Sequence, residues 1–163
     1  MTGSLEDLYQ DVILEHNKRP RNFRVLPTAN RKADGYHALC GDRLTLYLVV
    51  EAGVIREACF QGSGCAISQA SASLLTDDIR GKTVREAEEV IDRLQRMTSS
   101  PDEVPRPDGL GELSALAGVR QFPARIECAS LSWQTLSAAL DRRTSSRSDN
   151  RAVFPLTNSL FRI

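Results

Sequence analysis

Apolar residues recur at helical spacing in the first segment of the chain. Within residues 5–18 they fall on one side of a helix, at Leu5, Leu8, Tyr9, Val12, Ile13 and His16. Pro20 follows, and a proline both ends a helix and pushes the preceding residue, Arg19, out of helical geometry. The pattern therefore predicts an amphipathic helix over residues 5–18, followed by a long loop over 19–39 with room for one short strand.

Alternating apolar positions then predict two strands. In residues 44–51, three leucines alternate with Thr45, Tyr47 and Val49, as expected for a strand that buries one face. The segment 54–61 follows after Ala52-Gly53, a short turn of small residues. We therefore predict a hairpin made of these two strands.

The second half of the chain has helical patterns. Residues 66–80 are rich in Ala and Leu and end at Gly81, a residue typical of helix C-termini. Thr83 and Glu86 have the spacing of a capping box, which predicts a helix over 83–97. Prolines and glycines make residues 99–111 a loop.

Two further helices are expected after this loop. The segment 110–119 has room for a short helix, and residues 129–142 show a strong helical pattern with apolar side chains on one face. With the predicted hairpin, these elements indicate an α+β fold in which a small antiparallel sheet of about three strands has helices packed on one face.

The character of the chain changes after Arg142. Residues 144–151 are small and polar, whereas the last residues are again apolar. We therefore expect a folded domain over residues 1–143 and a flexible C-terminal tail over residues 144–163.

Composition narrows the choice of partners and of compartment. The 163 residues contain 21 Lys and Arg against 21 Asp and Glu, so the charge balance favours neither nucleic acid nor an anionic membrane as partner. No apolar run approaches the ~20 residues of a membrane helix, and the N-terminal residues lack a signal pattern, so we expect a cytoplasmic protein. In that reducing compartment, the four cysteines are better interpreted as metal ligands or catalytic thiols than as disulfides.

Three of the cysteines lie where predicted elements begin. Cys40 and Asp42 are separated only by Gly41, just before the first strong strand. Cys65 and Cys128 each precede a predicted helix, where free N–H groups and the helix dipole favour a thiolate, the form that binds metal and attacks sulfur. Cys65 and Cys128 could equally be buried, inert side chains.

Several longer motifs follow one another in a fixed order. The first is Leu8-Tyr9 through His16 with Pro20-Arg21-Asn22-Phe23, the second is Cys40-Gly41-Asp42, and the third is residues 60–73 around Gly62-Ser63-Gly64-Cys65. The last group comprises Leu116-Ala117-Gly118-Val119, Phe122-Pro123-Ala124-Arg125-Ile126, Cys128-Ala129 and Leu131-Ser132-Trp133. Over residues 5–142 this order resembles the SufU/IscU family of iron–sulfur cluster assembly proteins, which are NifU N-terminal-like. The long interval between Cys65 and Cys128 holds an extra segment, near residues 95–115, that resembles the SufU branch.

The resemblance implies the SufE/NifU-like fold and a specific chemistry. It implies a zinc site made of Cys40, Asp42, Cys65 and Cys128. Cys40 would be the catalytic thiol that accepts persulfide sulfur from a cysteine desulfurase, and Arg125 would contact that partner. The sulfur would pass to a downstream iron–sulfur scaffold or to apo-proteins.

The resemblance leaves alternatives open. The same four residues could instead hold a [2Fe–2S] cluster or iron, which would make the protein a scaffold rather than a sulfurtransferase-like enzyme. The protein could also be a non-catalytic, zinc-stabilised interaction module.

This chain departs from the family pattern near two of these residues. His37-Ala38-Leu39 stands where family members commonly have Asn-Pro-x before the first cysteine, and His37 could compete as a ligand. Glu127 replaces the lysine usual in the SufU branch. A carboxylate beside Cys128 should disfavour its thiolate unless metal is bound. Cys59 matches no family cysteine, and we interpret it as a strand residue.

Overall fold

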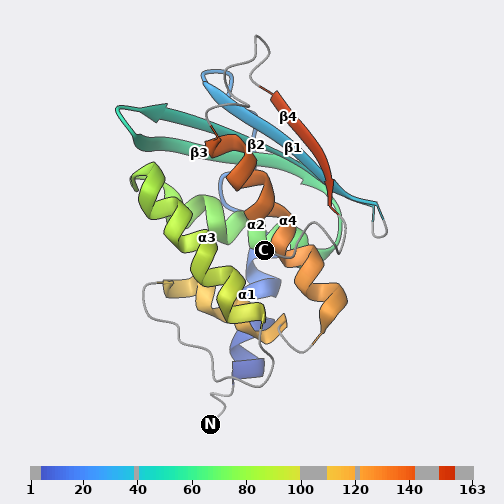
Figure 1. Ribbon diagram of the computed structural model, residues 1–163. Coiled ribbons are helices and arrows are strands. Elements are labelled where there is room, and N and C mark those ends of the chain that lie inside the picture. The colour runs from blue at the N-terminus through green and yellow to red at the C-terminus, as the bar shows by residue number, and fades with distance from the viewer. Residues whose placement is uncertain (1–4, 39–40, 100–109, 120–121, 142–150, 157–163) are drawn as a thin grey trace.

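A computed structural model describes residues 5–38, 41–99, 110–119, 122–141 and 151–156 of the chain. Their elements are, in order, α1 (Leu5–Lys18), β1 (Arg31–His37), β2 (Asp42–Glu51), β3 (Val54–Ser63), α2 (Ala66–Ile79), α3 (Val84–Ser99), the 3-10 helix η1 (Gly111–Val119), α4 (Pro123–Leu140) and β4 (Arg151–Leu156) (Figure 1).

The sheet has the strand order β3-β2-β1-β4. Strands β1, β2 and β3 are antiparallel neighbours, which confirms the predicted small antiparallel sheet. Positive φ angles of 52° at Ala52 and 76° at Gly53 make the tight connection between β2 and β3, as a two-residue hairpin requires. Strand β1 lies within the segment predicted as a loop with one short strand.

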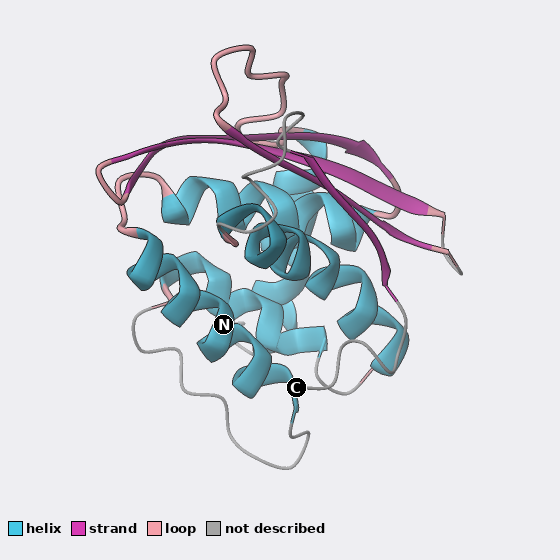
Figure 2. Cartoon of the chain, turned by 45° about the horizontal axis from the view of Figure 1, so that its top comes forward, coloured by secondary structure: helices cyan, strands magenta, loops and turns pink. Residues whose placement is uncertain are grey.

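The helices cover one face of this sheet (Figure 2). Helix α4 packs against β1 and β2, helix α2 packs against β3, and α1 contacts α2 and η1 farther from the sheet. The predicted arrangement of helices on one face is therefore confirmed. The layer between sheet and helices holds the main core, in which Trp133, Phe60 and Leu46 are among the largest fully buried side chains.

The opposite face of the sheet has a smaller apolar cluster. Leu26, from the loop that follows α1, packs there with Tyr47 and Cys59. Cys59 is fully buried, and burial raises the pKa of its thiol. It is a structural side chain on the far face of the sheet from the main core, as the sequence indicated.

One predicted helix start is confirmed, and another lies earlier in the chain than predicted. The capping box is confirmed, because Thr83 N–H donates to Glu86 Oε1 at 2.9 Å and Glu86 N–H donates to Thr83 Oγ1 at 3.1 Å. The last helix starts at Pro123, six residues earlier than predicted. Proline is favoured in the first turn of a helix because its φ is already helical and the N–H that it lacks would have no intrahelical partner there.

The predicted C-terminal tail includes one regular element. Residues 151–156 form β4, which pairs in parallel with β1 at the edge of the sheet (Figure 1). Pro155 suits such an edge, because proline cannot donate a ladder hydrogen bond. The rest of the tail lies outside the described residues, and the domain boundary near residue 143 stays a prediction. In the described part of the chain, no helix has both the length and the apolar character that a membrane span needs.

A buried polar network joins α1, the following loop and α2. His16 is 2% exposed, and its Nδ1 lies 2.7 Å from Ser73 Oγ. The backbone N–H of Arg21 donates to the same hydroxyl at 2.7 Å, so the hydroxyl proton is free to point at His16. Nε2 of His16 lies 3.7 Å from a carboxylate oxygen of Glu112. Burial, and next the charge of Arg21, lower the pKa of His16, although Glu112, Asp77 and Glu15 act in the opposite direction.

We expect His16 to make the protein less stable as the pH falls below neutrality. Because the pKa of His16 is lower in the folded chain than its unfolded value of 6.5, the unfolded chain binds the proton first. The free energy of unfolding should therefore decrease as the pH falls through 6.5, by up to ~1.4 kcal/mol per pH unit. Urea unfolding of metal-free wild type and His16→Asn between pH 7.5 and 5.5 would measure this. Equal pH slopes in the two proteins would contradict it.

Candidate metal centre

Three of the four predicted metal ligands gather at one end of the sheet. Ligand atoms of Asp42, Cys65 and Cys128 all lie within 4.8 Å of one another. Asp42 is the first residue of β2, Cys65 is the N-cap of α2, and Cys128 lies in α4. The fourth predicted ligand, Cys40, lies outside the described residues, so its membership of the site stays a prediction.

Asp42 and Cys65 are joined by a direct contact. The backbone N–H of Cys65 donates to Asp42 Oδ1 at 2.8 Å, and the thiol of Cys65 donates to Asp42 Oδ2 at 3.7 Å. Asp42 is fully buried, so this N–H partly satisfies a carboxylate that water does not reach. Gly64 makes the approach possible, because a Cβ at this position would lie 2.9 Å from Asp42 Cγ.

Cys65 is prepared to act as a thiolate. The thiol of Cys128 lowers the pKa of Cys65 to about 6, against desolvation, and the backbone N–H groups of Ser68 and Ile67 act in the same direction. These N–H groups belong to the first turn of α2, where N–H groups have no intrahelical acceptor. Cys65 follows the predicted pattern of a cysteine at a helix N-terminus.

Cys128 does not follow that pattern. The sequence predicted that it precedes the last helix, but α4 begins at Pro123 and Cys128 lies inside it, buried. Its position beside Cys65 therefore comes from the packing of α4 against α2, not from the free N–H groups of a helix end.

A buried hydroxyl network holds α2 and α4 together close to these cysteines. Ser71 Oγ donates to the backbone oxygen of Ala129 at 2.6 Å, and Trp133 Nε1 donates to Ser71 Oγ at 3.0 Å. All three groups are buried. Because Ala129 follows Cys128 directly, the network fixes the position of Cys128 on α4 relative to α2.

The donor set fits a zinc ion. Zinc binds thiolate at ~2.3 Å and carboxylate at ~2.0–2.2 Å, so two ligands of one tetrahedral site lie about 3.3–3.8 Å apart. The 3.7 Å between Cys65 Sγ and Asp42 Oδ2 agrees with that separation. Two thiols and a carboxylate also form the kind of mixed set that holds iron in an iron–sulfur cluster when further thiolates are available.

The predicted partner residue, Arg125, is exposed in the first turn of α4. Its guanidinium carbon lies 4.4 Å from the centre of the Phe122 ring, and Phe122 is itself 43% exposed. The two side chains form one exposed cation–π pair on the helix that carries Cys128. The structure therefore leaves Arg125 accessible to a partner.

His37 and Glu127 lie together, which the sequence did not predict. Nε2 of His37 lies 2.7 Å from Glu127 Oε1. Each residue departs from the family pattern, but the two are far apart in the sequence. Neither spacing nor periodicity could have shown that β1 and α4 bring them into contact.

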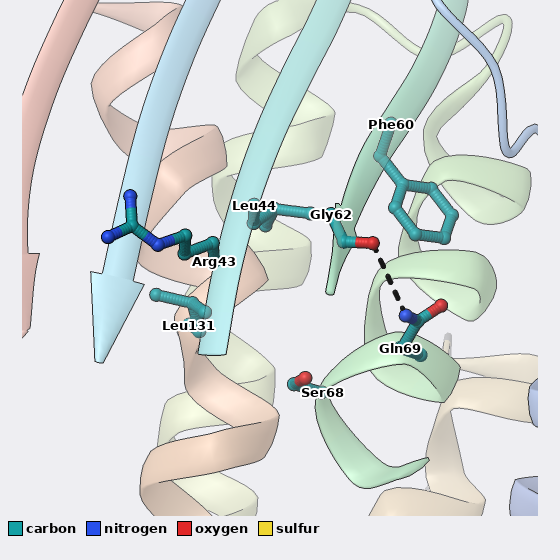
Figure 3. A pocket seen from close by; sticks show the side chains of 7 residues that line it. All are labelled: Arg43, Leu44, Phe60, Gly62, Ser68, Gln69 and Leu131. Carbon is teal, nitrogen blue, oxygen red and sulfur yellow. Dashed lines mark hydrogen bonds between the residues drawn. The ribbon is translucent and has the colours of Figure 1, made fainter. Parts of the chain in front are cut away.

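A small pocket is lined by residues that are close in sequence to the predicted ligands (Figure 3). Arg43 and Gly62 line it from the paired ends of β2 and β3, Ser68 and Gln69 line it from α2, and Leu131 lines it from α4. The amide of Gln69 donates to the backbone oxygen of Gly62 at 3.4 Å across this pocket (Figure 3). Most of these residues are one to three positions from a predicted ligand, so the pocket belongs to the surroundings of the same centre.

Antiparallel strands β1, β2 and β3 with helices on one face, and an Asp–Cys–Cys group at the end of the sheet that could hold a metal ion, define a small α+β protein with a candidate metal centre. Residues 8–140 match the family model described as the NifU-like N terminal domain. The chain belongs to this family.

Curated relatives and a solved structure agree with that assignment. The chain is 40% identical over 134 residues to the zinc-dependent sulfurtransferase SufU of Bacillus subtilis, covering 82% of this chain and 90% of the relative. It is 36% identical to the iron–sulfur cluster assembly scaffold protein IscU of Thermotoga maritima, covering 83% and 94%. The crystal structure of a putative iron–sulfur cluster assembly scaffold protein for the SUF system, from Fervidobacterium islandicum, superposes with a TM-score of 0.76 at 32% identity, covering 85% of this chain and all of that one.

Proposed function

We propose that this protein serves iron–sulfur cluster assembly as a zinc-dependent sulfur acceptor, with Cys40 as the accepting thiol. The observation that carries the proposal is that ligand atoms of Asp42, Cys65 and Cys128 lie within 4.8 Å of one another. In the sequence, Asp42 is the last residue of the Cys40-Gly41-Asp42 motif. The similarity to a zinc-dependent sulfurtransferase supports it.

Cys40, Asp42, Cys65 and Cys128 would hold the zinc ion. When bound, zinc keeps its thiol ligands ionised and protects them from oxidation. The chain contributes the lowered pKa of Cys65, the buried carboxylate of Asp42 and the rigid packing of α2 on α4. These features assemble the ligands before a partner arrives.

Sulfur transfer itself would be a thiolate exchange. The sulfur of Cys40, as a thiolate, attacks the terminal sulfur of a cysteine persulfide on the partner. A new S–S bond forms on Cys40 while the S–S bond of the partner breaks, and the partner cysteine leaves as a thiolate. The exchange needs no external oxidant or reductant.

The expected partner is a cysteine desulfurase, and the expected recipient is a downstream iron–sulfur scaffold or an apo-protein. The exposed pair of Arg125 and Phe122 is our candidate for the desulfurase contact. It lies on α4, the helix that also carries Cys128, so a partner bound there would be close to the metal centre.

The alternative function is a scaffold that assembles a [2Fe–2S] cluster on the same residues. One observation favours it: the chain is also similar to proteins named as scaffolds. A non-catalytic zinc module is the remaining alternative, and it would need zinc for stability but no reactive thiol.

The test combines metal content with a sulfur-transfer assay. Protein purified without oxygen should contain about one zinc per chain and no visible absorption. It should stimulate a cysteine desulfurase, and Cys40→Ala should abolish that stimulation, because the thiolate proposed to accept the sulfur is then missing. Cys59→Ala is the matched control, since Cys59 lies in a separate buried cluster.

The outcomes separate the three functions. Iron, acid-labile sulfide and a brown spectrum would replace the sulfur-acceptor proposal with the scaffold. If the protein contains one zinc per chain and Cys40→Ala stimulates the desulfurase as wild type does, the non-catalytic zinc module is the function that remains.

A further inference from the structure

The contact between His37 and Glu127 is short, buried and close to the metal centre. Nε2–H of His37 donates to Glu127 Oε1 at 2.7 Å, since a carboxylate offers only acceptors. The side chains of the two residues are 3% and 17% exposed. Little water therefore competes for the bond, and hydrogen bonds to a charged acceptor are among the stronger ones.

Each partner of this bond is adjacent to a predicted metal ligand. His37 is the last residue of β1 and is the register partner of Asp42, the first residue of β2. Glu127 directly precedes Cys128 in α4. The bond therefore connects the end of β1, which pairs with the Asp42 end of β2, to the helix turn that carries Cys128.

Two other connections hold the same centre. The N–H of Cys65 connects the start of α2 to Asp42, and Ser71 connects α2 to α4 beside Cys128. The bond between His37 and Glu127 connects α4 back to the strand pair. The elements that carry Asp42, Cys65 and Cys128 are thus connected pairwise. The connection from Cys65 to Asp42 is direct, and the other two run through Ser71 with Ala129 and through His37 with Glu127.

We propose that His37 and Glu127 are a positioning pair that fixes Asp42 relative to Cys128 and so keeps the metal-binding group assembled. This inference rests on the proposed function for the identity of the metal. Neither residue is offered as a ligand, because the described residues whose possible ligand atoms lie within 4.8 Å of one another are Asp42, Cys65 and Cys128.

The test is a double-mutant cycle on zinc release. We expect Glu127→Ala and His37→Ala each to speed the transfer of zinc from the protein to a colorimetric chelator by about 10-fold, the lower end of the effect of outer-shell changes on metal sites. The double variant should release zinc no faster than the faster single variant, because both remove the same bond. Glu127→Gln should stay near the wild-type rate, because its amide oxygen can still accept from His37.

A second readout does not depend on zinc. In metal-free protein, alkylation followed by mass spectrometry should show faster modification of Cys128 in Glu127→Ala and His37→Ala than in wild type. Glu112→Ala is the control for the loss of a glutamate near a buried histidine, since Glu112 lies 3.7 Å from Nε2 of His16 and also pairs with Arg21. It should leave both readouts unchanged.

The results separate this inference from the proposed function. Failure of wild type to bind zinc would count against the proposed function, and the alkylation rates would then decide the inference alone. The positioning role is overturned if His37→Ala matches wild type in both readouts, or if the effects of the two single variants simply add. It is also overturned if Glu127→Gln behaves like Glu127→Ala, since charge beside Cys128 would then explain the effect.

Discussion

Replacing Cys65 with alanine is expected to abolish stoichiometric zinc binding. Cys65 is the centre of the ligand group, because its thiol contacts Asp42 and lies beside Cys128. Its loss removes the ligand whose pKa is lowered to about 6, the thiol most readily ionised near neutral pH. Metal analysis should find about one zinc per chain in wild type and little in the variant.

Stability should follow the metal. A ligand present at 1,000 times its dissociation constant stabilises the folded state by ~4 kcal/mol. For a chain of this size that corresponds to a Tm shift of about 10 °C. With zinc present, Cys65→Ala should therefore melt about 10 °C below wild type, and a chelator should lower the Tm of wild type by a similar amount.

Cys59→Ala provides the comparison for this experiment. It is also a change of cysteine to alanine, but Cys59 lies with Leu26 and Tyr47 on the other face of the sheet. It should keep one zinc per chain and respond to the chelator as wild type does. If Cys65→Ala also keeps its zinc, the centre drawn from Asp42, Cys65 and Cys128 is wrong.

Replacing Gly64 with alanine is expected to weaken the site without removing a ligand. The added Cβ would lie 2.9 Å from Asp42 Cγ and 3.0 Å from its Cα. Contacts this short force the carboxylate or the strand to move. Overpacking of this kind typically costs ~1–3 kcal/mol. Because Asp42 is itself a predicted ligand, we expect the dissociation constant for zinc to rise by roughly 100-fold, the upper end of the losses from disturbed outer shells of metal sites.

Gly81→Ala separates the clash from the general cost of losing a glycine. Gly81 has a φ of +87° and open space around the position of a Cβ. Alanine there should cost about 1–2 kcal/mol in backbone strain, while zinc affinity stays at the wild-type value. Competition titrations against a chelator of known affinity would measure both variants. Equal zinc affinity in Gly64→Ala and wild type would show that Asp42 is not held against Gly64 as a ligand.

Many features of this protein could be predicted from the amino-acid sequence, because the signals for them are local. Helical spacing, the Ala52-Gly53 turn and the capping box at Thr83 act over a few residues, and each is found in the structure. The motif order indicated the family, and the family match over residues 8–140 confirms it. Asp42, Cys65 and Cys128 were also predicted to lie together, and their ligand atoms do lie within 4.8 Å of one another, but this prediction depended on the resemblance, and their role as metal ligands stays a prediction.

Tertiary structure decided what local patterns cannot encode. Cys128 was expected at a helix end, but Pro123 starts α4 earlier, and only packing of α4 on α2 brings its thiol to Cys65. The parallel pairing of β4 with β1 joins segments more than 100 residues apart. The bond between His37 and Glu127 has the same origin. Contacts between residues distant in sequence depend on how the sheet and helices stack, because no periodicity within a single element specifies its neighbour in space.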